Sequence, residues 1–576
     1  MKTYLKQLPL WLTLTASVPA LTGCIDEGDD LSDVDTTVRI AVNDLVIPIN
    51  IDAITLSTVL DLNDASADGL VRVVDGAYAA VVDGSFSSDP IYVAPIVLRE
   101  REASTFSAPL TTPTGSSVVG IPYPVTQPVY ISSDYGVQNV SQTITSVTRL
   151  GLDWSYGLKI SVVGASAISS MELRDLVLQF PKGLTATPSA GTYDAATGLV
   201  SIPTLPLSNG SATVVLQASG LEVSTAGLVY DRAAQTMKLD AQVGVVSGNL
   251  VPLALSGSTK PEGLSLSVAT QAGALTVKSF GGILDYVLSG FSLPEVSLSG
   301  LPDVLSQSST NLTLLNPQLY LALTNPVAPY GATNVSTGLT LTPVRDGLAG
   351  TPCSPDGGSI TIATSANTGQ GSVVMAPSDP STRYPGYAAA LFARFTSLPS
   401  LLSGDGLPSA IRIEASNAGL RDMAVAGFPL GTLGRVEGSY TFFAPLQFEA
   451  GSTVVYTGTD SGWHSEELEY LTIETMTVTA NVSSTLPMDV DVTVTPLDEA
   501  GNPIDAVVEG AHIAAGASGA KFTVTLRGQV TQLDGVRYEA RAVVPQSASS
   551  TALAPSQQLS FSDIRICVGG YYQKEL

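Results

Sequence analysis

Apolar and polar residues alternate along many short stretches of this chain. In 488–498 (MDVDVTVTPLD), Val490, Val492 and Val494 would share one face of an extended strand, with polar side chains on the other face. The same period of two recurs in the stretches 157–163, 211–219 and 521–527. These patterns predict half-buried β-strands.

Clusters of turn residues separate the alternating stretches. Examples are Asp194–Gly198 and Glu499–Pro503, and no regular alternation with long helical patterns accompanies them. Two short helices are predicted, one in 53–62 after a capping Asp52 and one in 384–398. The expected fold class is therefore all-β, with several antiparallel β-sandwich domains in tandem and a few short helices.

The length of 576 residues is too great for one core and indicates roughly three to five domains. Composition shifts near 118–130, 260 and 440 suggest their limits. The predicted segments are a signal peptide in 1–23, an acidic flexible tether in 24–37, an N-terminal β-rich domain in 38–117, a β-sandwich in 118–260, a β-sandwich with short helices in 261–440 and a C-terminal β-sandwich in 441–576.

The first residues form a leader with the order of features found in secretory signals. Lys2 and Lys6 precede an apolar stretch at 8–14, and small residues lead to Cys24. This apolar stretch is too short to cross a bilayer, and no later stretch offers the ~20 uninterrupted apolar residues of a spanning helix. Membrane contact is therefore expected through Cys24.

The residues Leu21-Thr22-Gly23-Cys24 resemble a bacterial lipobox. The resemblance implies cleavage before Cys24 and attachment of lipid, such as palmitate, to its sulfur and new amino group. Several acyl chains, at about 0.8 kcal/mol per buried methylene, would hold a protein firmly in a membrane. The alternative is a buried free cysteine that follows an apolar stretch by chance.

A run of acids follows Cys24, namely Asp26, Glu27, Asp29, Asp30, Asp33 and Asp35. So many like charges with few apolar neighbours predict an extended tether. The run also resembles the acidic signal behind the lipidated cysteine of Bacteroidetes-type lipoproteins, which implies an outer-membrane anchor facing the cell exterior. A plain solvated spacer on a periplasmic protein remains the alternative.

The net charge and the remaining cysteines limit the partners. The formal charge of -25, without a cluster of Lys and Arg, excludes nucleic acid as a partner. Besides Cys24 the chain has only Cys353 and Cys567, which either form a disulfide in an oxidising compartment or remain buried thiols. A cysteine-based metal site is not expected, because no C-x-x-C spacing occurs.

The stretch 176–223 resembles the repeated immunoglobulin-like domains of bacterial surface proteins. The similar features are Pro181–Leu184, Tyr193-Asp194 followed by Thr197-Gly198, and a final alternating strand. The resemblance implies that the segment 118–260 is an immunoglobulin-like β-sandwich. Those modules often occur in tandem, whereas this chain shows one clear example.

The best candidate for a metal site lies in 64–75 (DASADGLVRVVD). The spacing of an EF-hand loop would place oxygen ligands at Asp64, Ser66, Asp68 and Asp75, with Gly69 at the sharp turn. However, the following residues alternate and contain Asp-Gly turn signals at 75–76 and 83–84, which favours a polar turn and a hairpin. No cofactor is expected except, on this spacing, a structural calcium ion.

A glycan site would need an exposed aromatic ring beside polar side chains. Trp463 lies in a polar loop with Asp460, His464 and Glu466, and either contacts a sugar or fastens its loop to the core. Trp154 is expected in the core. The tyrosines of 121–136 offer a second candidate surface or a stiff connector.

No residue pattern supports catalysis. The chain lacks a G-x-S-x-G elbow and a phosphate-binding glycine loop, and it has only two histidines. We therefore expect no enzyme but a lipid-anchored adhesive or structural protein of the cell surface, with glycans or other surface proteins as partners. The alternatives are a glycan-binding lipoprotein of an outer-membrane uptake system and a hydrolase with an unrecognised site.

Overall fold

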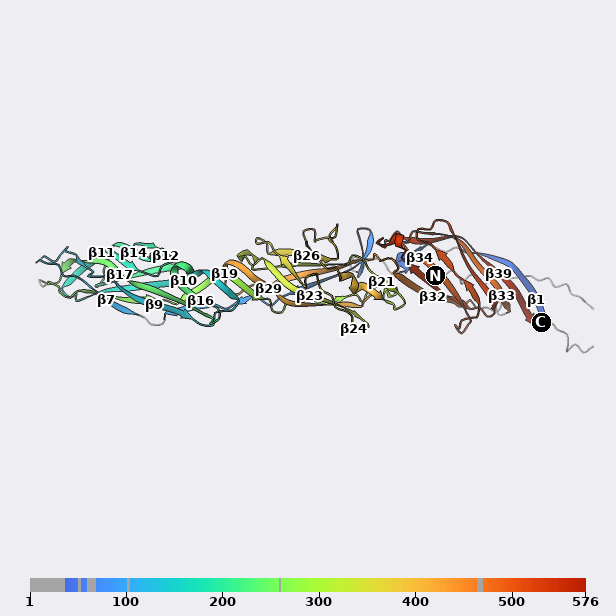
Figure 1. Ribbon diagram of the computed structural model, residues 1–576, viewed down its shortest axis with the longest axis horizontal. Helices are drawn as coiled ribbons and strands as arrows, with labels where there is room; N and C mark the ends of the chain where they lie inside the picture. The colour runs from blue at the N-terminus through green and yellow to red at the C-terminus, as the bar shows by residue number, and fades with distance from the viewer. Residues whose placement is uncertain are drawn as a thin grey trace, which may run out of the picture.

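The computed structural model describes residues 37–49, 53–59, 69–100, 104–115, 117–257, 260–463 and 470–575. These residues form a long rod of almost wholly antiparallel strands (Figure 1). The α-helices within the described ranges are single turns, and none is long and apolar enough to span a bilayer. The structure confirms the all-β fold class with several antiparallel sheets and few short helices.

Three groups of strands follow one another along the rod, and we call them the base, middle and distal modules. The base module contains β1 (Thr37–Ile49), β2 (Ile54–Thr55), α1 (Leu56–Val59), β32 (Thr453–Ser461), β33 (Leu471–Ser484), β34 (Asp489–Leu497), β35 (Val507–Glu509), β36 (Ala511–Ile513), β37 (Ala520–Val530), β38 (Gly535–Val543), a 3-10 turn (Gln546–Ala548) and β39 (Gln558–Glu575). Its two sheets pack face to face, with Phe522 and Val524 of β37 in one cluster with Val490 of β34.

The middle module is also built from two sheets. It contains β3 (Val71–Val74), β4 (Ala77–Ser87), β5 (Tyr92–Val93), β20 (Val296–Ser297), α3 (Asp303–Ser306), β21 (Asn311–Thr313), β22 (Gln318–Thr324), a 3-10 turn (Ala328–Tyr330), β23 (Asn334–Arg345), β24 (Leu348–Ala349), β25 (Ser359–Ala363), β26 (Gln370–Ala376), β27 (Leu391–Arg394), a 3-10 turn (Leu398–Leu402), β28 (Ser403–Asp405), β29 (Ala410–Pro429), β30 (Gly431–Thr432) and β31 (Glu437–Pro445). One sheet has the order β27-β26-β22-β31-β4-β3, and β23, β25 and β29 form the facing layer.

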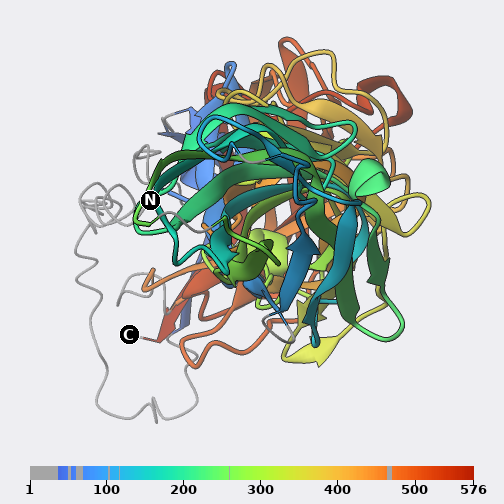
Figure 2. The same ribbon diagram turned by 90° about the vertical axis from the view of Figure 1, so that its left-hand side faces the viewer.

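The distal module holds the longest uninterrupted part of the chain. It contains β6 (Ile96–Glu100), β7 (Thr105–Pro109), β8 (Tyr123–Pro124), β9 (Val129–Val137), β10 (Ile144–Val163), β11 (Ile168–Gln179), β12 (Leu184–Pro188), β13 (Thr192–Asp194), β14 (Leu199–Pro206), β15 (Ser211–Glu222), α2 (Val223–Ala226), β16 (Leu228–Asp231), β17 (Thr236–Leu255), β18 (Ser265–Ala272) and β19 (Leu275–Val287). Figure 2 looks along the rod from this end.

The chain runs out along the rod and back again. The first strand, β1, pairs with the last strand, β39, so that the two lie side by side at one end (Figure 1). The expected N-terminal domain of 38–117 is wrong in this respect, because its strands pair with partners in all three modules: β1 with β39, β4 with β31, β6 with β19 and β7 with β18. Composition follows the order of the sequence and could not reveal such long-range pairing.

The buried side chains show which modules are continuous. One cluster of apolar side chains fills the distal and middle modules and reaches the base at Val454, Val544 and Leu553. The rest of the base is filled by two smaller clusters around Val482 and Leu526. The distal and middle modules therefore share one core.

The strands predicted from alternation are present. The stretches 488–498 and 521–527 coincide with β34 and β37, and 157–163 and 211–219 lie in β10 and β15. Trp154 is buried, as expected. The helix predicted in 384–398 is wrong: this region contains β27 instead, because Pro385 and Gly386 interrupt a helix while Tyr384 and Tyr387 pack onto a sheet.

The hairpin expected after Gly69 is confirmed. β3 and β4 pair across a two-residue turn in which Asp75 and Gly76 have φ of 51° and 82°, the left-handed conformation that such turns require. The second predicted turn, at Asp83-Gly84, is wrong because both residues lie within β4. A Cβ on Gly84 would come 2.3 Å from the ring of Tyr440, so only a glycine leaves room for this ring to pack over β4.

The segment that resembles an immunoglobulin-like domain forms β11 to β15 of the distal module. Tyr193 donates a hydrogen bond from its hydroxyl to the carbonyl oxygen of Pro181 (2.7 Å), and burial raises the pKa of Tyr193 to about 12. Thr197 Oγ1 donates to Asp194 Oδ2 (2.7 Å) in the turn between β13 and β14. These residues therefore fix the turns of an antiparallel sheet.

Candidate binding pocket

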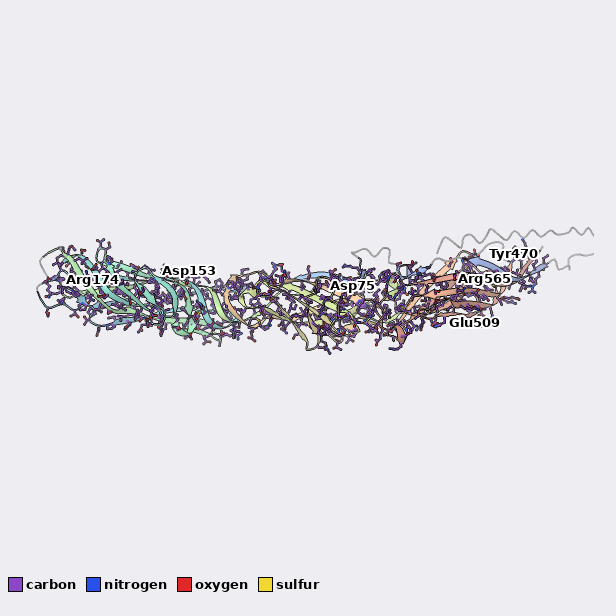
Figure 3. All side chains as sticks on the ribbon, turned by 90° about the horizontal axis from the view of Figure 1, so that it is seen from above. Asp75, Asp153, Arg174, Tyr470, Glu509 and Arg565 are labelled. Carbon is purple, nitrogen blue, oxygen red and sulfur yellow. The ribbon has the colours of Figure 1, made fainter. Side chains whose placement is uncertain are left out.

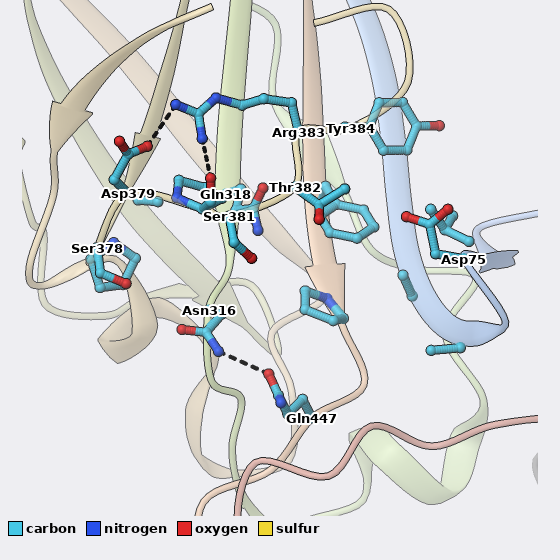
Figure 4. A pocket seen from close by; sticks show the side chains of 18 of the residues that line it. Asp75, Asn316, Gln318, Ser378, Asp379, Ser381, Thr382, Arg383, Tyr384 and Gln447 are labelled. Atoms are coloured by element: carbon cyan, nitrogen blue, oxygen red, sulfur yellow. Dashed lines mark hydrogen bonds and ion pairs between the residues drawn. The ribbon is translucent and has the colours of Figure 1, made fainter. Parts of the chain in front are cut away.

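A pocket of about 410 Å³ opens on the middle module, near its junction with the base. Four segments meet there: the turn between β3 and β4, the start of β22, the loop after β26 and the end of β31 (Figure 4). The residues that line it include Asp75, Gln318, Arg383, Tyr384 and Phe443. Figure 3 shows Asp75 near the middle of the rod.

One wall of the pocket belongs to residues 377–390, which we call the strap. Two of its tyrosines lie on the outer face of the sheet: the rings of Tyr384 and Tyr387 are 6.2 Å and 4.7 Å from that of Tyr320. The backbone nitrogen of Tyr384 donates to the hydroxyl of Tyr320 (2.9 Å), and the Tyr384 ring lies 5.4 Å from that of Phe443. These contacts place the half-buried rings of Tyr384 and Phe443 beside the pocket.

The charged residues of the strap are already paired with each other. Arg383 donates to Asp379 Oδ1 (2.6 Å) and to the carbonyl oxygen of Pro380 (Figure 4). On the opposite rim, Asn316 Nδ2 donates to Gln447 Oε1 (2.8 Å). The rim therefore combines a neutralised guanidinium with two amides.

One polar side chain of the pocket is almost fully buried. Gln318 is 7% exposed, and its Oε1 accepts a hydrogen bond from the Tyr320 hydroxyl. Gln318 lies opposite Phe443 in the pairing of β22 with β31, so both side chains are on the face that the strap covers. Tyr78 borders the pocket from β4, but its side chain belongs with Leu446 to the core on the other face of the sheet.

The calcium hypothesis receives no support from these contacts. Asp64, Ser66 and Asp68 lie outside the described residues, and Asp75 occupies the hairpin turn at the rim of the pocket. In the ranges that the structure covers, no group of three or more His, Cys, Asp or Glu side chains could hold a metal ion. In the described part of the segment 64–75, the residues with EF-hand spacing thus belong to the β3–β4 hairpin.

Trp463 fastens its loop to the base. It packs beside Leu526 and Val568, its backbone nitrogen donates to the carbonyl oxygen of Asp534 (2.8 Å), and it is half-buried. Asp460 lies at the end of β32, and His464 lies outside the described residues. The structure thus favours the core-packing alternative for Trp463.

The second candidate glycan surface is not formed. Tyr123 and Tyr135 are fully buried in the distal module, and only Tyr130 of the three tyrosines is exposed. A strand exposes every second side chain, so tyrosines close in sequence need not share a surface.

The structure favours the free-thiol alternative for the two remaining cysteines. Cys353 and Cys567 are both free, since Cys353 pairs by its backbone with Leu341 of β23 in the middle module, whereas Cys567 lies in β39 of the base. Burial raises the pKa of the Cys353 thiol. Cys24, the predicted lipidation site, lies outside the described residues.

Comparisons with known proteins assign no family. No protein-family model matches the chain, and no curated protein matches it. Among solved structures, one similar chain is a protein from Parabacteroides distasonis ATCC 8503 described as secreted, with 13% sequence identity and a TM-score of 0.34. The similarity covers 51% of this chain and 90% of that chain. The rod and the pocket therefore carry the functional argument.

Little in the sequence indicates this pocket. Its lining comes from four separate segments, 74–79, 316–318, 376–384 and 443–447, and Gln318 stands at the start of a strand like many other polar residues. The Tyr-Pro-Gly-Tyr stretch at 384–387 was a usable signal, because a proline and a glycine between two aromatic residues favour a loop that packs by its rings.

Proposed function

We propose that the protein is a lipid-anchored stalk of the bacterial cell envelope, which carries its distal module away from the membrane and acts in adhesion or as a structural element. The observation that supports this is the position of Thr37, the first described residue, at the base end of the rod. Twelve residues separate Cys24 from Thr37, and they can span at most about 45 Å. An acylated Cys24 would therefore keep the base close to the membrane.

The surface at the distal end supports a role in adhesion. β10 begins beside the middle module and ends at Val163, which puts Val163 at the distal end together with Leu253 of β17 and the loop around Val119. These three side chains are 42–51% exposed. The flanking segments 103–133 and 241–259 contain no charged residue, although the chain as a whole is strongly acidic. Lys260 adds one charge there, since its Nζ donates to the carbonyl oxygens of Pro113 (2.6 Å) and Gly115 (3.0 Å). A surface with few charges and exposed apolar side chains is typical of an interaction site.

The anchor is tested by replacing Cys24 with serine. Wild type should incorporate labelled palmitate and sediment with membranes, and the Cys24→Ser chain should do neither. Protease added to intact cells should cleave the wild-type protein if it faces the medium. An unlabelled wild-type chain that still sediments with membranes would refute the lipid anchor.

Adhesion is tested at the distal end with the variant Val119→Asp/Leu253→Asp. This variant should reduce binding of cells to one another or to a surface, because it places charge in the apolar patch. Val507→Asp is the control, since Val507 is also an exposed apolar residue (66%) but belongs to the base. Equal adhesion by all three chains would leave a structural role as the better proposal.

A glycan-binding role is the second candidate, and the pocket beside the strap favours it. The rings of Tyr384 and Phe443 and the neutral amides and hydroxyls that line the pocket have the chemistry that sugars require, and Trp463 is not needed for it.

A further inference from the structure

We propose that the base end of the rod lies directly on the lipid surface. The contact uses a group of side chains at or next to the outer ends of β1, β39 and β33, which we call the end face: Val38, Ile40, Tyr470, Leu471, Tyr572 and Lys574. Figure 3 shows Tyr470 at this end of the rod. Only the closeness of the end face to a membrane depends on the stalk proposal.

The end face continues the core face of a base sheet beyond its core. Every second side chain of a strand points to the same face, so Val568, Tyr572 and Lys574 share one face of β39. Val568 is buried in an apolar cluster of the base. Ile40, which pairs with Tyr572, is 42% exposed. Val38, which pairs with Lys574, is 39% exposed. Apolar side chains that share the face of the core but remain in solvent indicate a surface with a partner.

Tyrosine rings beside cations suit the boundary between water and lipid. The half-buried rings of Tyr470 and Tyr572 are 5.8 Å apart, and Nζ of Lys574 lies 4.9 Å from the centre of the Tyr470 ring. On the other face of the same sheet, the guanidinium carbon of Arg39 lies 3.5 Å from the centre of the Tyr571 ring. Tyrosine is enriched at membrane interfaces, and long cationic side chains can reach lipid phosphates from such positions.

The place where the described chain begins favours lipid over a protein partner. Thr37 lies at the outer end of β1, and the twelve residues between it and Cys24 span at most about 45 Å. A bilayer that holds an acylated Cys24 would always be within reach of the end face, whereas a protein would have to enter the space between them. The acids in 26–35 and 466–469 would be repelled by anionic lipid, so a zwitterionic phospholipid is the expected partner.

Fluorescence on phosphatidylcholine vesicles can test the inference. A leaderless chain with a histidine tag in place of Cys24 is held on the vesicles by a nickel-chelating lipid, while Cys353→Ser and Cys567→Ser remove the remaining thiols. Ile40→Cys then carries an environment-sensitive dye, and part of the lipid carries a nitroxide quencher just below its headgroup. Because the tag replaces the acyl chains, the result does not depend on lipidation of Cys24.

The emission of the dye at position 40 should shift to shorter wavelength when the chain is on vesicles. Its quenching should be at least about threefold stronger than with the dye on Val46→Cys, because Val46 lies six residues, or ~20 Å, further along β1 and an interfacial contact is only about 5–10 Å deep. Val73→Cys is the matched control, since Val73 is 45% exposed on β3, at the edge of a sheet in the middle module, and should show no quenching.

Val38→Asp, added to the chain labelled at position 40, should lower the quenching to the level of position 46, because a carboxylate in the end face opposes contact with lipid. Thermal unfolding shows that each variant is folded. Equal quenching at positions 40, 46 and 73, or none at any of them, would overturn the inference. Quenching at position 40 that Val38→Asp leaves unchanged would also overturn it. Palmitate labelling tests Cys24 separately, so either proposal can fail while the other holds.

Discussion

The two junctions of the rod are built differently. Between the distal and middle modules, β19 and β29 form a ladder that extends from Ser279 opposite Pro429 to Val287 opposite Gly419. Phe280 and Phe428 lie on these two strands, are fully buried and have ring centroids 5.5 Å apart. A sheet and a core therefore continue through this junction.

The middle and base modules meet through shorter contacts. Asn311 of β21 pairs with Thr453 of β32, and isolated bridges join Leu314 to Phe448 and Gln447 to Ala552. The buried Thr310 accepts a hydrogen bond from the backbone nitrogen of Val455 (3.2 Å). This junction therefore combines one pair of strand residues and several loop hydrogen bonds with the edge of the apolar core at Val454, Val544 and Leu553.

The difference indicates where unfolding should divide the chain. Modules that share a sheet and a core unfold together, whereas modules joined by a few contacts can unfold separately. We therefore expect calorimetry to show two transitions, one for the distal and middle modules and one for the base. The following predictions test this division, from the largest expected effect to the smallest.

Alkaline pH should unfold the distal and middle unit first. Burial raises the pKa of Tyr135, Tyr156 and Tyr193 above 10, the value for the unfolded chain, and that of Tyr193 to about 12. The unfolded chain then releases protons that the folded chain keeps, so stability present below pH 10 is lost as the pH rises toward 12. In calorimetry from pH 9 to 11.5, the unfolding temperature of the larger transition should fall faster than that of the base transition. An equal fall in both unfolding temperatures would contradict the division.

Phe280→Ala should destabilise the distal and middle unit by about 3–5 kcal/mol, because it leaves a cavity where the two modules meet. The base transition should stay in place. Val524→Ala in the core of the base is the control and should move only the other transition. If Phe280→Ala split the larger transition in two, the distal and middle modules would be separate units.

Thr310→Val should weaken the junction with the base by about 1–3 kcal/mol, because it leaves the backbone nitrogen of Val455 buried without its acceptor. The base transition should shift to lower temperature. Thr270→Val is the matched control: Thr270 is also buried and accepts from a backbone nitrogen, that of Ser104, but both belong to the distal module. An unmoved base transition in Thr310→Val would show that other contacts hold this junction.

Two tyrosine variants should have small effects within the larger unit. Tyr156→Phe removes a hydrogen bond to Ser133 Oγ (3.0 Å), and it should cost about 1 kcal/mol. Tyr123→Phe removes a hydroxyl that has no partner in the described structure, so stability should be unchanged or slightly higher. Denaturant unfolding of both variants measures the difference, and an equal loss in both would show that the Tyr123 hydroxyl is bonded.

Local features of the fold could be predicted from the sequence, because they depend on neighbouring residues. The alternation in 488–498 predicts β34, and Asp75-Gly76 predicts the turn before β4. The order of the strands in space could not be predicted, since β1 and β39 pair across more than five hundred residues. For this reason the segment 38–117, expected as one domain, contributes strands to all three modules.

The candidate site was less predictable than the fold. The calcium and glycan hypotheses relied on residues close together in sequence, whereas the pocket unites segments around Tyr78, Gln318, Tyr384 and Phe443. Gln318 resembles any polar residue at the start of a strand until the fold places it opposite Phe443 and beside the strap. Such proximity is a property of the folded chain and leaves no trace in the spacing of residues along the sequence.

The pairing of β1 with β39 has a mechanical consequence. β1 lies along the rod, with Thr37 at the outer end and its partners running from Glu575 to Ile564 (Figure 1). Tension between the residues before Thr37 and the distal end would pull β1 lengthwise against β39. The hydrogen bonds of the pair would then bear the load together, as in shear, and would not open one after another from the end. The strand nearest the proposed point of attachment is thus the one placed to resist force.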